Sequence, residues 1–165
     1  MDISSALLAL TQVAVGLIGF SSVLIALSGE PRNWSALDTY RIKGMLASSI
    51  CLLLLSLVPF LLSSFGVEDQ IVWRCSAGAI AVLLVIGMVT NLRGYLRLSD
   101  ADRATTRPPF VWAIYAVGSL VLAAEAAAAL GLLASPEGTY FLGLFFTLTL
   151  ASYLIVRFLF ARPNR

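Results

Sequence analysis

The sequence predicts an all-α polytopic membrane protein, a bundle of five transmembrane helices. Apolar residues make up 59% of the 165 residues, charged residues only 12%, and the mean hydropathy is +0.93. A soluble domain carries about 25% charged residues, so this chain has too little polar surface to be one. Five apolar stretches each approach or exceed the ~20 residues that a helix needs to cross the hydrocarbon layer. We expect spans at about 3–27, 44–64, 71–92, 110–134 and 140–160, which form a single transmembrane domain over 1–165 without a separate soluble domain.

The basic residues predict the orientation of this bundle. Ten of the eleven Lys and Arg residues lie in three segments, which follow the first, third and fifth stretches. Short basic loops stay on the cytoplasmic side, so we expect the N-terminus outside and the C-terminus in the cytoplasm. The same rule explains the net charge of +2, which therefore does not indicate a nucleic-acid partner. The ten residues are Arg32, Arg41, Lys43, Arg93, Arg97, Arg103, Arg107, Arg157, Arg162 and Arg165.

The first stretch carries a face of small and polar residues. It lacks a positive n-region and is longer than the apolar core of a signal peptide, so we expect it to remain as a span. Small residues let helix backbones approach closely in lipid, so this face should meet a helix of the same chain or of another copy. It is either a purely structural seam or one that also lines a conduit in an oligomer. Its residues recur at alternating steps of four and three: Ser5, Ala9, Gln12, Gly16, Gly19, Val23 and Ala26.

The segment before the second stretch has the composition of a membrane interface. Ser35 and Asp38 have the spacing of a capping box, so a short interfacial helix should lead into the span. Trp34 and Tyr40 stand among cations, a mixture typical of the headgroup region. The segment is either a plain connector or a docking surface for a partner or an anionic lipid.

Two features modify the middle spans. Pro59 should kink the second span, and Ser56 or a water molecule should bond the carbonyl that the proline leaves free. The third span should continue past the membrane as a helix, because Arg93 and Arg97 lie one turn apart and cations suit a helix C-terminus.

The remaining boundaries follow from loops and prolines. A polar break over 99–109 should end at Pro108 and Pro109, which suit the first turn of the fourth helix. The loops near 68–69 and 136–137 are short, so spans two and three, and spans four and five, should be antiparallel neighbours. Aromatic residues near span ends are expected in interfacial belts. They are Trp73, Trp112, Tyr115, Tyr140 and Phe160.

Glu125 is the only acidic residue well inside a predicted span. A carboxyl group in the hydrocarbon layer costs several kcal/mol unless it is protonated, paired or hydrated, so an intramembrane Glu is a functional candidate by default. Gly118 and Ala129 share its helix face and would let a partner helix approach. Counting inward at ~1.5 Å per residue places Gln12 at nearly the same depth, about 14 Å.

A polar layer is therefore expected near the middle of the bundle. Ser56 and Thr149 fall near the same depth, and Arg74 could reach down to it or snorkel outward. In a structural interpretation, Glu125 is protonated or ion-paired with Arg74, and it hydrogen-bonds Gln12. In a functional interpretation, Glu125 binds or relays a cation or a proton.

The residue content excludes several kinds of site. Histidine is absent, and Cys51 and Cys75 lie at different depths, so we expect no metal site, no haem, no other cofactor and no His-based triad. An intramembrane enzyme ranks last, because only Arg74 could act as a second catalytic group beside Glu125.

Two functions remain ahead of an enzyme. We expect an oligomeric ion or proton channel or transporter that uses Glu125; the alternative is a non-transporting scaffold or accessory subunit of a larger membrane complex. Its expected partners are membrane lipids and either further copies of the chain or another membrane subunit. The abundance of Ala, Leu and Arg with a single Lys favours a bacterial inner membrane.

Overall fold

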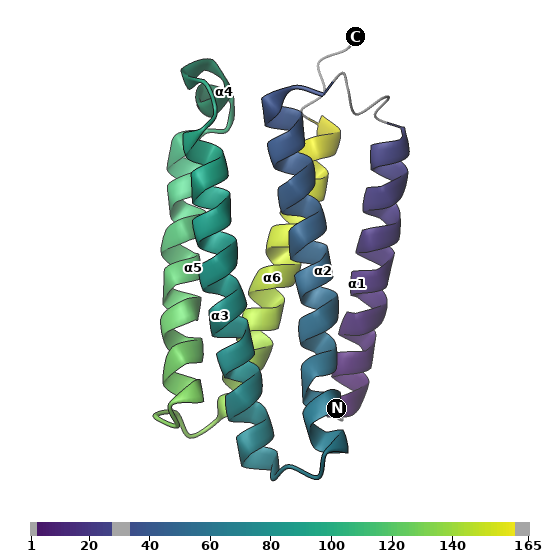
Figure 1. Cartoon of the computed structure of the whole chain (residues 1–165), viewed down its shortest axis with the longest axis vertical. Coiled ribbons are helices and arrows are strands. Elements are labelled where there is room, and N and C mark those ends of the chain that lie inside the picture. Colours follow the sequence, from purple (N-terminus) through teal and green to yellow (C-terminus); the bar gives the residue numbers. More distant parts are fainter. Residues whose placement is uncertain (1–2, 28–33, 161–165) are drawn as a thin grey trace.

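The computed structural model of the chain describes residues 3–27 and 34–160, which form helices and short connections only (Figure 1). Of these described residues, 88% are helical and none is in a strand. Among them, five helices are long and apolar enough to cross a membrane: α1 (Ile3–Ala26), α2 (Ala36–Ser64), α3 (Asp69–Leu96), α5 (Pro108–Ala129) and α6 (Pro136–Phe160). A short helix, α4 (Asp100–Thr105), joins α3 to α5. The prediction of an all-α protein with five spans is confirmed.

α2 begins eight residues before the predicted span because a capping box starts it. The Ser35 hydroxyl oxygen accepts from the Asp38 N–H at 3.0 Å, and the Asp38 carboxylate accepts from the Ser35 N–H at 3.3 Å. This confirms the capping box. The expected interfacial helix and the second span are one continuous helix rather than two elements.

α5 ends at Ala129, five residues before the predicted boundary, because a Schellman motif stops it. Gly131 has a φ of 75° and donates its N–H to the Ala128 carbonyl at 3.0 Å. The N–H of Leu132 reaches back to the Ala127 carbonyl at 2.9 Å. The apolar run continues beyond this point, but the left-handed glycine ends the helix. α6 then begins at Pro136, four residues earlier than predicted, since proline suits a first helical turn.

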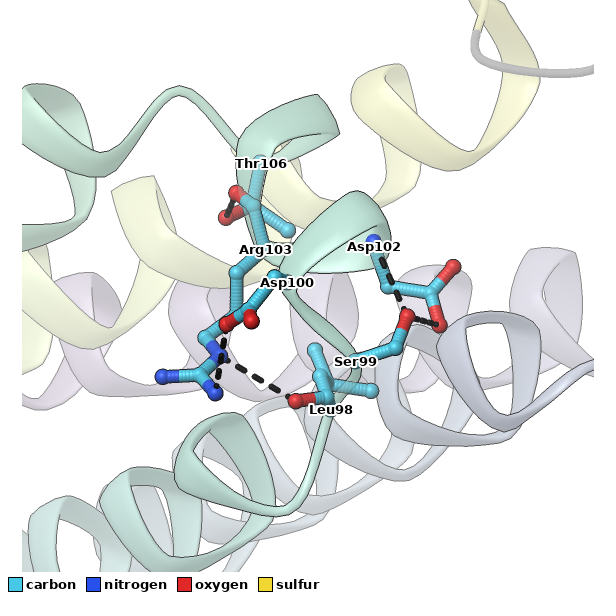
Figure 2. A network of polar contacts seen from close by, with 6 residues as sticks. All are labelled: Leu98, Ser99, Asp100, Asp102, Arg103 and Thr106. Carbon is cyan, nitrogen blue, oxygen red and sulfur yellow. Dashed lines mark hydrogen bonds and ion pairs between the residues drawn. The ribbon is translucent and has the colours of Figure 1, made fainter.

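α4 lies in the segment that was predicted to be only a polar break. The Ser99 hydroxyl accepts from the Asp102 N–H at 3.1 Å and donates to the Asp102 carboxylate at 2.7 Å. Arg103 pairs with Asp100 at 3.0 Å on the same short helix (Figure 2). Ser99 and Asp102 have the same spacing as Ser35 and Asp38, so the sequence did contain a signal for this helix.

α6 is the central helix of the bundle. It contacts each of the other four long helices, whereas α1 packs mainly on α2 and α5 packs on α3 and α6. α1 and α5 therefore stand on opposite sides of the bundle (Figure 1). The predicted neighbours, α2 with α3 and α5 with α6, are in contact.

The two ends of the bundle differ in charge. We call the end that carries α4 the basic end; it holds the start of α2 and the ends of α3 and α6 (Figure 1). Arg74 lies near the opposite end, early in α3. Arg32, Arg162 and Arg165 lie outside the described residues. The described cations of the basic end are Arg41, Lys43, Arg93, Arg97, Arg103, Arg107 and Arg157.

A side chain of α6 supplies the hydrogen bond that Pro59 removes from the backbone of α2. Pro59 has no N–H, so the Leu55 carbonyl one turn earlier lacks its helical donor. The Tyr140 hydroxyl donates to this carbonyl. Ser56, the expected partner, donates instead to the Leu53 carbonyl at 2.9 Å, so that prediction was wrong. The placement of Tyr140 in an interfacial belt was also wrong, since its side chain is 0% exposed.

Replacing Tyr140 with Phe should destabilise the fold by about 1–2 kcal/mol, because the Leu55 carbonyl would be left without a donor in an apolar interior. The loss should shrink in a Pro59→Ala background, where the restored N–H takes the carbonyl. Reversible unfolding in mixed micelles measures both values. Tyr115→Phe is the control, since its hydroxyl reaches the Met88 carbonyl only at 3.4 Å. If Tyr140→Phe costs the same stability with Pro59 and with Ala at position 59, the Tyr140 hydroxyl does not compensate for the proline.

Candidate functional site

Glu125 is 0% exposed and lies where α5 meets α6 and α3. Its carboxyl group occupies space that Gly143 of α6 leaves open: a Cβ atom at position 143 would overlap Glu125 Oε1. The same Cβ would lie 3.0 Å from two side-chain atoms of Ile80 on α3. The absence of a side chain at Gly143 is therefore what admits the carboxyl group between the helices.

The Gly143 backbone N–H lies close to the Glu125 carboxyl without forming a regular hydrogen bond, and no side chain among the described residues bonds either oxygen. Tyr140 lies within electrostatic range, but its hydroxyl donates to the Leu55 carbonyl. An unpaired carboxylate in an apolar interior costs several kcal/mol, so a proton, a cation or a water molecule would stabilise Glu125 there.

The expected polar layer is not assembled around Glu125. Gln12 lies on the exposed face of α1, on the far side of the bundle from α5 (Figure 1). Arg74 lies against the end of α5, where a Cβ atom at Gly131 would be 2.6 Å from its Cζ, and it forms no ion pair with Glu125. The predictions of a hydrogen bond to Gln12 and of an ion pair with Arg74 were therefore wrong. Counting along a helix gives depth but not the side of the bundle.

Ser56 and Thr149 do not lie together either. Ser56 is buried, and its hydroxyl oxygen is 2.9 Å from that of Thr11, so this pair links α2 to α1. Thr149 is exposed and donates to the Phe145 carbonyl of its own helix at 2.8 Å. No pattern in the sequence singled out Thr11, which is partly buried, whereas its neighbour Gln12 lies on the exposed small-residue face.

The small-residue face of α1 points away from the rest of the chain. We call its seven residues, defined above from Ser5 to Ala26, the α1 seam; all seven are exposed. A Cβ atom at Gly16 or Gly19 would meet no atom within 4 Å. α1 packs instead through Leu7, Ala14, Ser21 and Leu24. No described helix of this chain covers the seam.

Gly118 and Ala129 do lie at close helix contacts. A Cβ atom at Gly118 would be 3.2 Å from the ring of Phe146, and the Cβ of Ala129 would be 3.7 Å from one at Gly78. These small residues let α5 approach α6 and α3 around Glu125, as their spacing predicted.

A cavity of about 480 Å³ lies between α2, α3, α5 and α6 and runs from the basic end toward Glu125. The lining residues farthest from the basic end include Ile80 and Thr147, and we call this part the cavity floor. Thr147 donates to the Gly143 carbonyl at 2.9 Å, one turn away, and Ile80 is the α3 residue beside Gly143. The floor thus adjoins the pocket that holds the Glu125 carboxyl. No pattern in the sequence pointed to this cavity.

Within the described residues, no three His, Cys, Asp or Glu side chains are grouped so that they could hold a metal ion. The chain matches no protein-family model, no curated protein and no solved structure. The geometry of Glu125 and of the cavity is therefore what points to function.

Gly143→Ala should destabilise the protein by about 1–3 kcal/mol, because the added methyl group overlaps the Glu125 carboxyl and crowds Ile80. Adding Glu125→Ala should recover part of this loss, since it removes the overlapping group. Gly16→Ala, at an open position, is the control and should not destabilise. Unfolding in mixed micelles measures the wild type, Gly143→Ala, Glu125→Ala, the double variant and the control. A loss that is the same with and without Glu125 would show that the carboxyl does not depend on Gly143.

Proposed function

We propose that the protein moves protons or small monovalent cations across a membrane, as a channel or transporter with Glu125 at its site. The supporting observation is a fully buried carboxyl group that no side chain among the described residues bonds and that adjoins the floor of a cavity. A carboxyl already held by an arginine or an amide would be a fixed structural group. A carboxyl that only a backbone N–H approaches keeps lone pairs available for a proton or a cation.

The surroundings of Glu125 differ between its two sides. Toward the basic end, Ile80 lines the cavity floor and also lies beside Gly143, against which the carboxyl packs. Toward the opposite end, Trp73 and Tyr140 pack with ring centroids 5.8 Å apart. Access from one side at a time is what a carrier or a gated channel requires, and it argues against a permanently open pore.

The route would run inside a single chain, because Glu125 is enclosed by helices of one bundle. An oligomer is therefore not needed to enclose the route, although copies could still associate through the α1 seam. We assign the basic end to the cytoplasm and the protein to a bacterial inner membrane as part of this proposal; the positive-inside rule supports the orientation.

Glu125→Gln should abolish proton or monovalent-cation flux in proteoliposomes, because the amide neither exchanges a proton nor carries charge. Glu68→Gln is the matched control: the same change at an exposed residue should leave flux unaltered. Flux is followed with a pH-sensitive dye and with ion gradients, at equal incorporation of each protein. Wild-type flux from the Glu125→Gln variant, or no flux from the wild type, would refute the proposal.

An accessory or scaffold role is the second candidate, and the exposure of the α1 seam favours it. A face of small residues turned toward lipid gains little from lipid itself, whereas it lets a helix of another subunit approach closely. The partner would be a second copy of the chain or another membrane protein.

Gly16→Leu should leave the fold of the single chain intact, since a Cβ atom there meets nothing within 4 Å. It should reduce association by blocking close helix approach at the seam. Val15→Leu, on an exposed position beside the seam, is the control. Crosslinking in native membranes followed by size analysis measures association. If Gly16→Leu associates as the wild type does, the seam is only a lipid-facing surface.

A further inference from the structure

We propose that the cavity binds an anionic amphiphile, with its charged head among the cations of the basic end and its apolar chain extending toward the cavity floor. This site lies beyond the proton or cation site at Glu125 and does not depend on it. A volume of about 480 Å³ falls within the range of roughly 300–1,000 Å³ that small-molecule sites occupy.

The charge of the lining is one-sided. Arg41, Lys43, Arg97 and Arg157 all line the cavity, whereas none of its described lining residues is Asp or Glu. All four cations lie toward the basic end, so the positive charge is concentrated at one end of the space. This arrangement complements a ligand with a single anionic head.

Arg41 is the strongest sign that a ligand is expected. Its side chain is only 9% exposed, and its buried Nε has no hydrogen-bond partner among the described residues. Arg157 adds repulsion, because it lies within electrostatic range of Arg41 and, among the described residues, bonds to the neutral oxygens of Tyr153 and Thr105. A carboxylate or phosphate between the two arginines would remove the repulsion and could accept from the Arg41 Nε.

Among the described residues, the two carboxylates within electrostatic range of Arg41 already have other partners. Asp38 and Asp102 lie within electrostatic range of Arg41, yet neither forms an ion pair with it. Asp38 is held by Ser35 in the cap of α2, and Asp102 is held by Ser99 in the cap of α4. The protein therefore provides partial charge balance at a distance and leaves the direct position to a ligand.

Below the cations, the wall is suited to a hydrocarbon chain. Most of the lining beyond the basic end is apolar. The apolar lining includes Leu83, Leu84, Met88, Ile114, Phe146 and Leu150. A small free anion would leave this volume unused, and a neutral apolar molecule would leave Arg41 without a partner. An amphiphile would fill the apolar volume and also pair with Arg41.

The cavity also has an open side through which a chain can pass. Lys43 and Ala47 of α2, and Gly87 and Thr90 of α3, line the cavity and are exposed at the same time. The gap between these helices therefore faces the surrounding bilayer. Near the basic end the Tyr40 hydroxyl donates to Asn91 Oδ1 at 2.5 Å, so one hydrogen bond holds α2 and α3 together there.

The test uses photoreactive lipids in vesicles that contain the full-length protein. One probe is a phosphatidylglycerol with a diazirine in its acyl chain, the second is the matching phosphatidylcholine, and the third is a diazirine fatty acid. Crosslinked peptides are identified by mass spectrometry. We expect the anionic probes to label cavity positions such as Cys51, Leu84 and Ile114, and the neutral lipid to label mainly outward residues such as Leu54 and Leu120.

The variants test the charge that selects the ligand. Arg41→Gln should weaken labelling of the cavity roughly tenfold at subsaturating probe, because a charge-assisted bond is lost. Arg41→Lys should retain most of it, which guards against a folding defect. Arg93→Gln is the matched control, because Arg93 is exposed and does not line the cavity.

Each outcome of the labelling experiment either supports or overturns the proposed site. Cavity labelling by phosphatidylglycerol identifies a bilayer lipid as the source, and labelling by the fatty acid alone identifies a free single-chain amphiphile; both support the site. Equal cavity labelling by the anionic and neutral lipids, no cavity labelling, or an Arg41→Gln protein that labels as the wild type does would overturn it. None of these results depends on ion flux, so failure here is distinct from failure at Glu125.

Discussion

The scarcity of water in a membrane interior makes every unpaired polar group expensive, and one hydrogen bond shows how this chain meets that constraint. Pro59 leaves the Leu55 carbonyl of α2 without a donor, and the Tyr140 hydroxyl supplies one from α6. This bond fixes the central helix against α2. One turn further along α6, Gly143 leaves the space in which the Glu125 carboxyl lies. Glu125 is the acidic member of the few described buried side chains that no other side chain bonds.

The sequence predicted the helices well because their signals are local. Hydropathy located five spans, and the capping box at Ser35 is present in the structure. Helix ends inside apolar runs were missed, as at Gly131, because a left-handed turn can stop a helix without a change in hydropathy. Glu125 was identified as a candidate because it is the only acidic residue well inside a predicted span. Its surroundings were not predicted, because depth along a helix does not reveal which way a side chain such as that of Gln12 faces.

The cavity could not have been predicted for a related reason. Its walls come from four helices that are far apart in sequence, and its existence depends on how α2 and α3 are spaced near the basic end. The two proposals place different demands on this space: proton or cation access to Glu125 needs water in it, whereas an amphiphile would fill it. If both hold, an occupied cavity would close the route, and the ligand would act as an inhibitor of flux.

The most direct test of the central claim is whether the Glu125 carboxyl exchanges its proton. Infrared spectra of the reconstituted protein, compared with those of Glu125→Gln, isolate the carbonyl band of this one side chain. We predict a protonated carboxyl band that shifts when the sample is transferred to D2O, because the proposed function requires Glu125 to exchange its proton with the adjoining cavity. A band that persists unshifted, or an ionised carboxylate that does not titrate, would contradict the account and leave Glu125 as a structural group.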